Sequence, residues 1–197
     1  NPFCNEPLDY VIKTDLTKKC DFNKIFIQTA KKILNDKTII NKDQSLLING
    51  IQTPGNLFLQ KNDITEKMKD IIYLEIENYR EKFQDSKEGF LKNWPKSYKI
   101  TGWLISMKSG GKLNPHFHDF GWLSGSIYIN VPPKKKTDSG NLVVCVDDIK
   151  DDKKSKKSID VVTGSFCLFP ASLTHYTIPF ESDEERIVLA FDVMPND

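Results

Sequence analysis

The stretch "NPHFHDFGWLSGSIYINVPP", residues 114–133, decides the fold prediction because it joins a histidine pair to an apolar run. Residues i and i+2 of an extended chain point to the same side, so His116 and His118 are expected to project together. The apolar run at 124–132 is typical of a strand, and two prolines stop it. The stretch therefore predicts a β-strand with two imidazoles on one face near its start.

From Ser97 onward, short apolar runs alternate with Gly/Pro turns, a pattern typical of an antiparallel sandwich or barrel. The predicted strands span residues 98–107, 124–132, 141–146, 158–162, 164–170, 174–179 and 186–194. Helices followed by strands indicate the α+β class. We therefore predict one domain, 1–197, in which a mainly helical support region, 1–95, precedes a β region, 96–197, that carries the site.

Two helices are predicted in the first half of the chain. One covers residues 22–34, with Asp21 as its cap and Asn35 at its end. A longer one opens at Asp63, where Asp63 and Glu66 resemble a capping box. The charged segment at 147–158 is expected to be a solvated hairpin loop, with a lid over a site as the alternative.

Composition excludes several function classes. The 197 residues are 39% hydrophobic and 28% charged with a net charge of +1, so no strong electrostatic grip on nucleic acid or an anionic membrane is expected. No apolar stretch is long enough to span a bilayer, and no signal peptide is apparent. No heptad repeat demands a second subunit, and the oligomeric state stays open.

Cysteine usage bears on the compartment. The four cysteines form no CxxC and no dense framework, so we expect reduced thiols and a cytoplasmic protein, with a Cys4–Cys20 disulfide as the alternative.

The chain has only three histidines, and the third, His175, begins another predicted strand. Two ligands from one strand and one from a distant strand would build a three-ligand metal site at a barrel mouth. Imidazole suits iron, zinc, copper and nickel, so the ligand type does not fix the metal. The alternative is a surface histidine pair that binds nothing.

Arg186 opens an otherwise apolar run, where an unpaired buried guanidinium would be costly. A structural ion pair with Glu184 or Glu185 is one interpretation. The other is a bidentate anchor for a ligand carboxylate deep in the barrel.

Two motifs carry a family resemblance. P-H-x-H followed by S-G-x-x-Y, and G-x-x-x-x-F-P-x-x-x-x-H followed by E-R, lie between Trp103 and Val193. This half of the chain resembles the 2-oxoglutarate/Fe(II)-dependent oxygenases of marine bacteria and phages. It is also similar to the aspartyl/asparaginyl β-hydroxylases and, more remotely, to prolyl hydroxylases.

The resemblance implies a double-stranded β-helix, the cupin-like jelly roll, with the N-terminal helices as a buttress. It also implies Fe(II), O2 and 2-oxoglutarate as cosubstrate. The implied reaction hydroxylates an aliphatic C–H of an unidentified substrate, either a peptidyl side chain such as Pro, Asn or Asp, or a small molecule.

The resemblance also implies roles for individual residues. His116 would be the first iron ligand and His175 the distal one. Arg186 would bind the C5 carboxylate of 2-oxoglutarate, assisted by Tyr128 and Ser124 on the neighbouring strand.

The third ligand departs from the usual pattern, since most such oxygenases have H-x-D or H-x-E. Here His118 holds that place and Asp119 follows it. On a regular strand Asp119 would face away, which favours His118, whereas a β-bulge would exchange the two. A water ligand, with His118 serving the substrate, is the third alternative.

Two rival functions remain at this point. One is a cupin-like three-histidine metalloenzyme that does not use 2-oxoglutarate, and the other is a non-catalytic jelly-roll binding module. Four aromatic residues near the motif could wall the substrate side, although most are expected in the core: Trp103, Phe117, Phe120 and Trp122.

Overall fold

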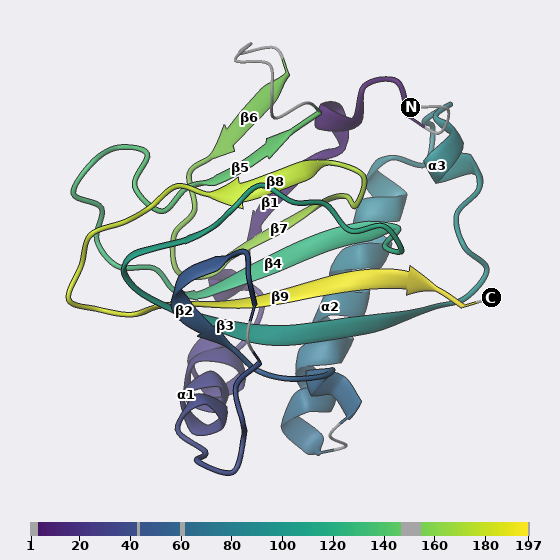
Figure 1. Cartoon of the computed structure of the whole chain (residues 1–197). Helices are drawn as coiled ribbons and strands as arrows, with labels where there is room; N and C mark the ends of the chain where they lie inside the picture. Colours follow the sequence, from purple (N-terminus) through teal and green to yellow (C-terminus); the bar gives the residue numbers. More distant parts are fainter. Residues whose placement is uncertain (1–3, 43, 60–61, 147–154, 197) are drawn as a thin grey trace.

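The computed structural model describes residues 4–42, 44–59, 62–146 and 155–196. These residues form two antiparallel sheets that face each other, with the helices on the outer face of the larger sheet (Figure 1). The strands are β1 (Ile12–Asp15), β2 (Leu47–Gln52), β3 (Tyr98–Leu113), β4 (Leu123–Asn130), β5 (Leu142–Cys145), β6 (Lys156–Ile159), β7 (Ser165–Pro170), β8 (Thr174–Thr177) and β9 (Arg186–Pro195). The α-helices are α1 (Gln28–Leu34), α2 (Asp63–Lys82) and α3 (Gly89–Lys92).

The strand order is that of a double-stranded β-helix. Within the described residues the larger sheet runs β1-β7-β4-β9-β3-β2 and the smaller one β6-β5-β8. Neighbours in each sheet are antiparallel, as the Gly/Pro-punctuated pattern predicts. The predicted α+β jelly roll is therefore confirmed.

Strand alternation gives the larger sheet two different faces. Leu123 and Ile127 of β4 pack with Leu189 of β9 in the cluster that also takes the buried face of α2. The intervening Tyr128 and Val188 belong to a second cluster, which lies between the two sheets. Because the period is two, residues 124, 126 and 128 of β4 and residues 186, 188, 190 and 192 of β9 share the inner face.

The helix predictions hold with one correction at a boundary. The Asp21 carboxylate accepts from the Lys24 amide at 3.1 Å, and Asn35 is the C-cap of α1. A π-helical segment, Asn23–Ile27, precedes α1. The capping box of α2, however, is not Asp63 with Glu66 but Asn62 with Thr65, one residue earlier. Asparagine caps as well as aspartate, and the threonine hydroxyl completes the box.

Two strands lie in the half that the sequence predicted to be helical. β1 pairs with β7, and β2 pairs with the second part of β3. β3 itself continues to Leu113, beyond the predicted end at residue 107. Gly111 permits this continuation, since a Cβ there would lie 2.6 Å from the Lys108 carbonyl oxygen. The resulting long strand carries the chain to the first histidine.

The structure also bears on the predictions for the charged loop, the disulfide and membrane-spanning helices. β6 begins at Lys156, two residues before the predicted strand, and pairs with β5. Residues 147–154 of the predicted charged loop lie outside the described residues. The alternative disulfide does not form, because Cys4 and Cys20 are free thiols. No helix of the described chain is long and apolar enough to cross a membrane.

Candidate metal centre

The three histidines of the chain meet at one end of the space between the sheets. His175 lies in β8, and His116 pairs with it outside any regular strand: each backbone amide donates to the other's carbonyl, at 3.1 and 2.8 Å. The amide of His118 donates to the Ala171 carbonyl at 3.3 Å. The expected strand at the histidine pair is thus replaced by an isolated bridge, yet the alternation survives, with Phe117 55% exposed between the two histidines.

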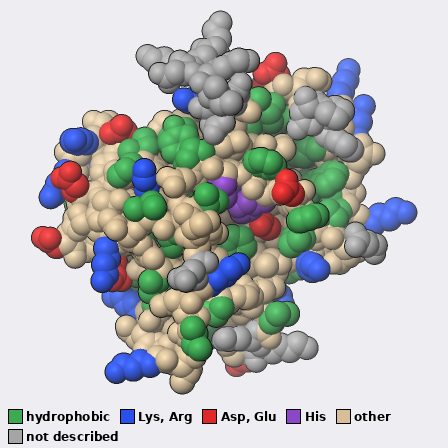
Figure 2. Space-filling model, viewed as in Figure 1, with side chains coloured by type: hydrophobic (Ala, Val, Ile, Leu, Met, Phe, Trp, Pro, Cys, Tyr) green, Lys and Arg blue, Asp and Glu red, His purple; other side chains and the backbone are tan. Residues whose placement is uncertain are grey.

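The imidazoles are close enough to share one ion. Their ring centroids are 4.3 Å apart for His116 and His175, 5.0 Å for His118 and His175, and 5.3 Å for His116 and His118. One nitrogen of each ring lies within 4.8 Å of those of the other two. Figure 2 shows the histidine side chains reaching the surface among hydrophobic ones.

Hydrogen bonds assign the ring nitrogens of His116 and His175. Nδ1 of His116 lies 2.8 Å from the Asn114 carbonyl oxygen, and Nδ1 of His175 lies 3.2 Å from that of Leu173. A carbonyl oxygen only accepts, so each Nδ1 carries the proton. The Nε2 lone pair of both rings is therefore available to a metal.

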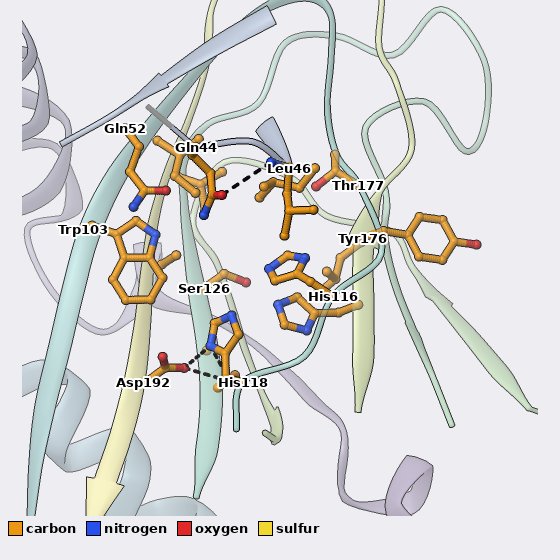
Figure 3. A pocket seen from close by; sticks show the side chains of 18 of the residues that line it. Gln44, Leu46, Gln52, Trp103, His116, His118, Ser126, Tyr176, Thr177 and Asp192 are labelled. Carbon is orange, nitrogen blue, oxygen red and sulfur yellow. Dashed lines mark hydrogen bonds and ion pairs between the residues drawn. The ribbon is translucent and has the colours of Figure 1, made fainter. Parts of the chain in front are cut away.

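A carboxylate makes the same assignment for His118. Its Nδ1 lies 2.6 Å from Asp192 Oδ1, an interaction drawn in Figure 3. The Ser124 hydroxyl donates to the same oxygen at 2.8 Å. All three imidazoles thus present Nε2, a donor set that fits Fe(II) and other borderline divalent ions.

Burial keeps two of the histidines neutral. It lowers the pKa of His116, and it lowers the pKa of His175 well below its ordinary value, with the charges of His116 and His118 acting in the same direction. Neutral imidazole is the form that binds metal.

Asp119, the alternative third ligand, does not join the cluster. Its side chain is exposed, and the group of metal-capable side chains found in the described residues contains His118 instead. No bulge exchanges the two positions. Asp192 is the acidic residue at the site that the sequence analysis missed, although its even spacing from Arg186 on one predicted strand placed both on the same face.

Arg186 lies at the start of β9, in the same cavity as the histidines. It is 1% exposed, its Nη2 donates to the Gly140 carbonyl at 3.0 Å, and its guanidinium carbon stands 5.0 Å from the centre of the Tyr128 ring. Its Nε has no hydrogen-bond partner among the described residues. None of the ion pairs formed by the described part of the chain includes it.

The structural ion pair considered for Arg186 is therefore wrong for the described residues. Glu185 instead accepts from the Ser106 hydroxyl at 3.0 Å. A fully buried guanidinium with a free N–H is suited to bind a ligand carboxylate. The cavity therefore fits 2-oxoglutarate at this end.

Tyr128 supplies a second donor beside Arg186. Its hydroxyl oxygen accepts from the Ser126 hydroxyl at 3.1 Å, which leaves its own O–H to donate elsewhere. Burial raises the pKa of Tyr128, so the phenol keeps its proton at neutral pH. Ser124, predicted to act beside Tyr128, bonds instead to Asp192, which lies six residues from Arg186 along β9.

The cavity that holds these groups has a volume of about 460 Å³. Its walls include apolar side chains of the larger sheet, such as Ile105 and Val188, and Leu142 of β5 in the smaller sheet. Of the four aromatic residues expected near the substrate, Trp103 and Phe117 line the cavity. The other two do not: Trp122 packs against the helix-side cluster and Phe120 is 80% exposed.

Residues 101–192 match the family model described as "Putative 2OG-Fe(II) oxygenase". A comparison with curated protein sequences finds no match.

Solved structures of low sequence identity share the fold. A prolyl-4-hydroxylase from Pseudomonas putida is 12% identical with a TM-score of 0.63, over 95% of this chain and 93% of the other. A Trichoplax adhaerens prolyl hydroxylase, solved with a peptide of the hypoxia-inducible factor, is 10% identical with a TM-score of 0.66, over 93% and 83%. HygX from Streptomyces hygroscopicus, with nickel and 2-oxoglutarate bound, is 10% identical with a TM-score of 0.59, over 98% and 87%.

Proposed function

We propose that the protein, whose residues 101–192 match the family model of the 2OG-Fe(II) oxygenases, uses Fe(II) and 2-oxoglutarate to hydroxylate an aliphatic C–H bond of its substrate. We further propose that residues 1–197 act as one unit. The support is that β1 and β2, from the first half of the chain, pair within the same sheet as β4 and β9.

One observation carries the proposal: a single cavity holds three imidazoles with free Nε2 atoms and a buried guanidinium with a free N–H. In a purely structural module, a buried cation without a counter-charge would only lower stability, because its desolvation penalty is roughly several kcal/mol until an anion pairs with it. A three-histidine enzyme that takes no dicarboxylate would not need it either.

The proposed ligands are His116, His118 and His175, each through Nε2. When bound, Fe(II) and 2-oxoglutarate supply oxidative decarboxylation by O2, giving succinate and carbon dioxide while one oxygen atom enters a substrate C–H bond. The Arg186 guanidinium binds the C5 carboxylate, and the Tyr128 hydroxyl donates to the same group. The apolar walls between them exclude water from this end of the cavity.

The substrate is proposed as a peptidyl side chain such as Pro, Asn or Asp, or a small molecule. Structures that share this fold include prolyl hydroxylases as well as HygX, which has also been solved with the small molecule hygromycin B bound. Trp103 and Phe117, at the cavity wall, are the aromatic surfaces that such a substrate would contact.

An anaerobic titration tests the proposal. Fe(II) and 2-oxoglutarate added to the protein are expected to produce a metal-to-ligand charge-transfer band. His175→Ala should abolish the band by removing a ligand, and Arg186→Ala should abolish it by removing the C5 anchor.

Lys134→Ala is the matched control, because it also removes one positive charge from the protein. The partners of Lys134 are Asn141 and Asp160, which lie outside the proposed ligand set. It should keep the band. Absence of the band in the unmodified protein would refute the oxygenase function.

A further inference from the structure

We propose that Asp192 is a positioning residue of the metal centre: its carboxylate fixes the ring of His118 for ligation and supplies a negative charge that three imidazoles lack. The inference rests on the proposed function, since it concerns the same ligand set.

The contacts of Asp192 are specific to this role. Its Oδ1 lies 2.6 Å from His118 Nδ1 and 2.8 Å from the Ser124 hydroxyl, which donates to it. The Ser124 oxygen is itself 3.2 Å from His118 Nδ1. An ionised carboxylate only accepts, so it requires the proton on Nδ1 and leaves Nε2 as the ligand atom. Two strands, β4 and β9, therefore hold one imidazole.

His118 needs such a partner, and the other two histidines do not. His116 and His175 are each oriented by the carbonyl two residues earlier in the chain, Asn114 and Leu173. His118 has no such local bond among the described residues, and its ring is oriented by a side chain 74 residues away. The third ligand position thus depends on the register between β4 and β9, in which Ser124 stands opposite Asp192.

Charge supports the same assignment. The Asp192 side chain is 13% exposed, and its one ion-pair partner in the described chain is His118. Among the described residues, no lysine or arginine forms an ion pair with the Asp192 carboxylate. Carboxylates behind ligating histidines raise ligand basicity and metal affinity. A negative charge one hydrogen bond behind His118 would thus offset part of the charge of a divalent ion.

The first test uses the metal-free protein, in which nitrogen NMR distinguishes the two imidazole tautomers. His118 should carry its proton on Nδ1 in the unmodified protein and lose this preference in Asp192→Ala. Asp192→Asn, whose amide oxygen still accepts, should retain it. Asp160→Asn removes an exposed carboxylate elsewhere and should change nothing. An Nδ1-protonated His118 in Asp192→Ala would overturn the positioning role.

The second test is a Co(II) titration followed by the visible absorption of the bound ion. Asp192→Ala should bind Co(II) about 10- to 100-fold more weakly than the unmodified protein. Asp192→Asn should show a smaller loss, which isolates the contribution of charge from that of orientation.

The outcomes separate the two proposals. An unmodified protein that binds no Co(II) refutes the metal centre itself. Co(II) binding that is equal in the unmodified protein and in Asp192→Ala refutes only the role of Asp192. Should Asp192→Ala fail to fold, the near-isosteric Asp192→Asn decides, and an affinity equal to that of the unmodified protein overturns the charge contribution.

Discussion

Arg186 is held in the interior of the protein beside a tyrosine ring and one backbone carbonyl. Burial lowers the pKa of its guanidinium, although arginine remains protonated in proteins. The site therefore retains a desolvated positive charge at the expense of stability, as binding sites for anions commonly do.

This balance predicts opposite effects of one substitution on stability and binding. Arg186→Met should leave the free energy of unfolding of the ligand-free protein unchanged or raise it by about 1–2 kcal/mol, because an apolar side chain replaces an unpaired buried charge. The same variant should bind 2-oxoglutarate roughly 10- to 150-fold more weakly, the loss expected for hydrogen bonds to a charged group. Urea unfolding and calorimetry measure the two quantities. A large loss of stability would contradict the interpretation.

The neutral histidines make stability depend on pH in a defined direction. Because their folded pKa values are lowered, the unfolded chain binds more protons than the native protein below about pH 6.5. The free energy of unfolding of the metal-free protein should therefore fall as pH drops below that value. The expected slope is up to about 1.4 kcal/mol per pH unit for each histidine.

Denaturant unfolding between pH 7 and pH 5 checks this dependence. His175→Gln has no group to protonate at that position and should show a shallower slope. A slope equal to that of the unmodified protein would exclude His175 as its source.

Among single residues, the three histidines stood out in the sequence because histidine is so scarce in this chain, and Arg186 stood out because it opens an apolar run. The structure places all four side chains at one cavity. The pairing of His118 with Asp192 was beyond sequence reasoning. It depends on which residue of β9 lies opposite Ser124, and a hydrophobic pattern fixes the face of a strand but not its partner.

At the scale of elements, β4 must pass close to the aromatic core. A Cβ on Gly125 would lie 2.2 Å from the ring of Phe191, which is 1% exposed. Gly125 therefore leaves room for the Phe191 ring to lie across β4, and its neighbours Ser124 and Ser126 face the cavity.

Gly125→Ala should consequently destabilise the protein by about 1–3 kcal/mol through overpacking. A thermal or urea unfolding curve measures the change. The double variant Gly125→Ala/Phe191→Leu should recover part of it by giving the methyl group room. The change in unfolding free energy of the double variant should be smaller than the sum of the changes in the two single variants. Equality of the two would point to another cause.

The β elements could be predicted where apolar residues are dense, as in β9 and in the first part of β3, residues 98–107. β2 could not, because Asn49 and Gly50 break its register with β3 and its pattern is that of a turn. β1 is four residues long and becomes a strand through its pairing with β7. Such edge strands owe their conformation to tertiary contact rather than to local sequence.

At the scale of the whole molecule, ligand binding should stabilise the entire fold, because the cavity is lined by both sheets. A ligand at 100 times its dissociation constant adds about 2.7 kcal/mol, which corresponds to a rise in Tm of roughly 5–10 °C for a chain of this size. Differential scanning fluorimetry with Mn(II), a redox-stable substitute, followed by 2-oxoglutarate, should show two successive rises.

The variants distinguish the two steps of that experiment. Arg186→Met should keep the rise caused by metal and lose the one caused by 2-oxoglutarate, whereas His175→Ala should lose both. An Arg186→Met protein that still responds fully to 2-oxoglutarate would show that the anchor lies elsewhere.

The reciprocal backbone hydrogen bonds between His116 and His175 have a consequence for motion. Both amide protons are released by one event, the separation of the loop after β3 from β8, so their exchange with solvent deuterium should proceed at matched rates. The free energy of that opening can then be measured at the very residues that would bind the ion. These two amide protons, fifty-nine residues apart in the chain, thus report the local opening of the metal centre.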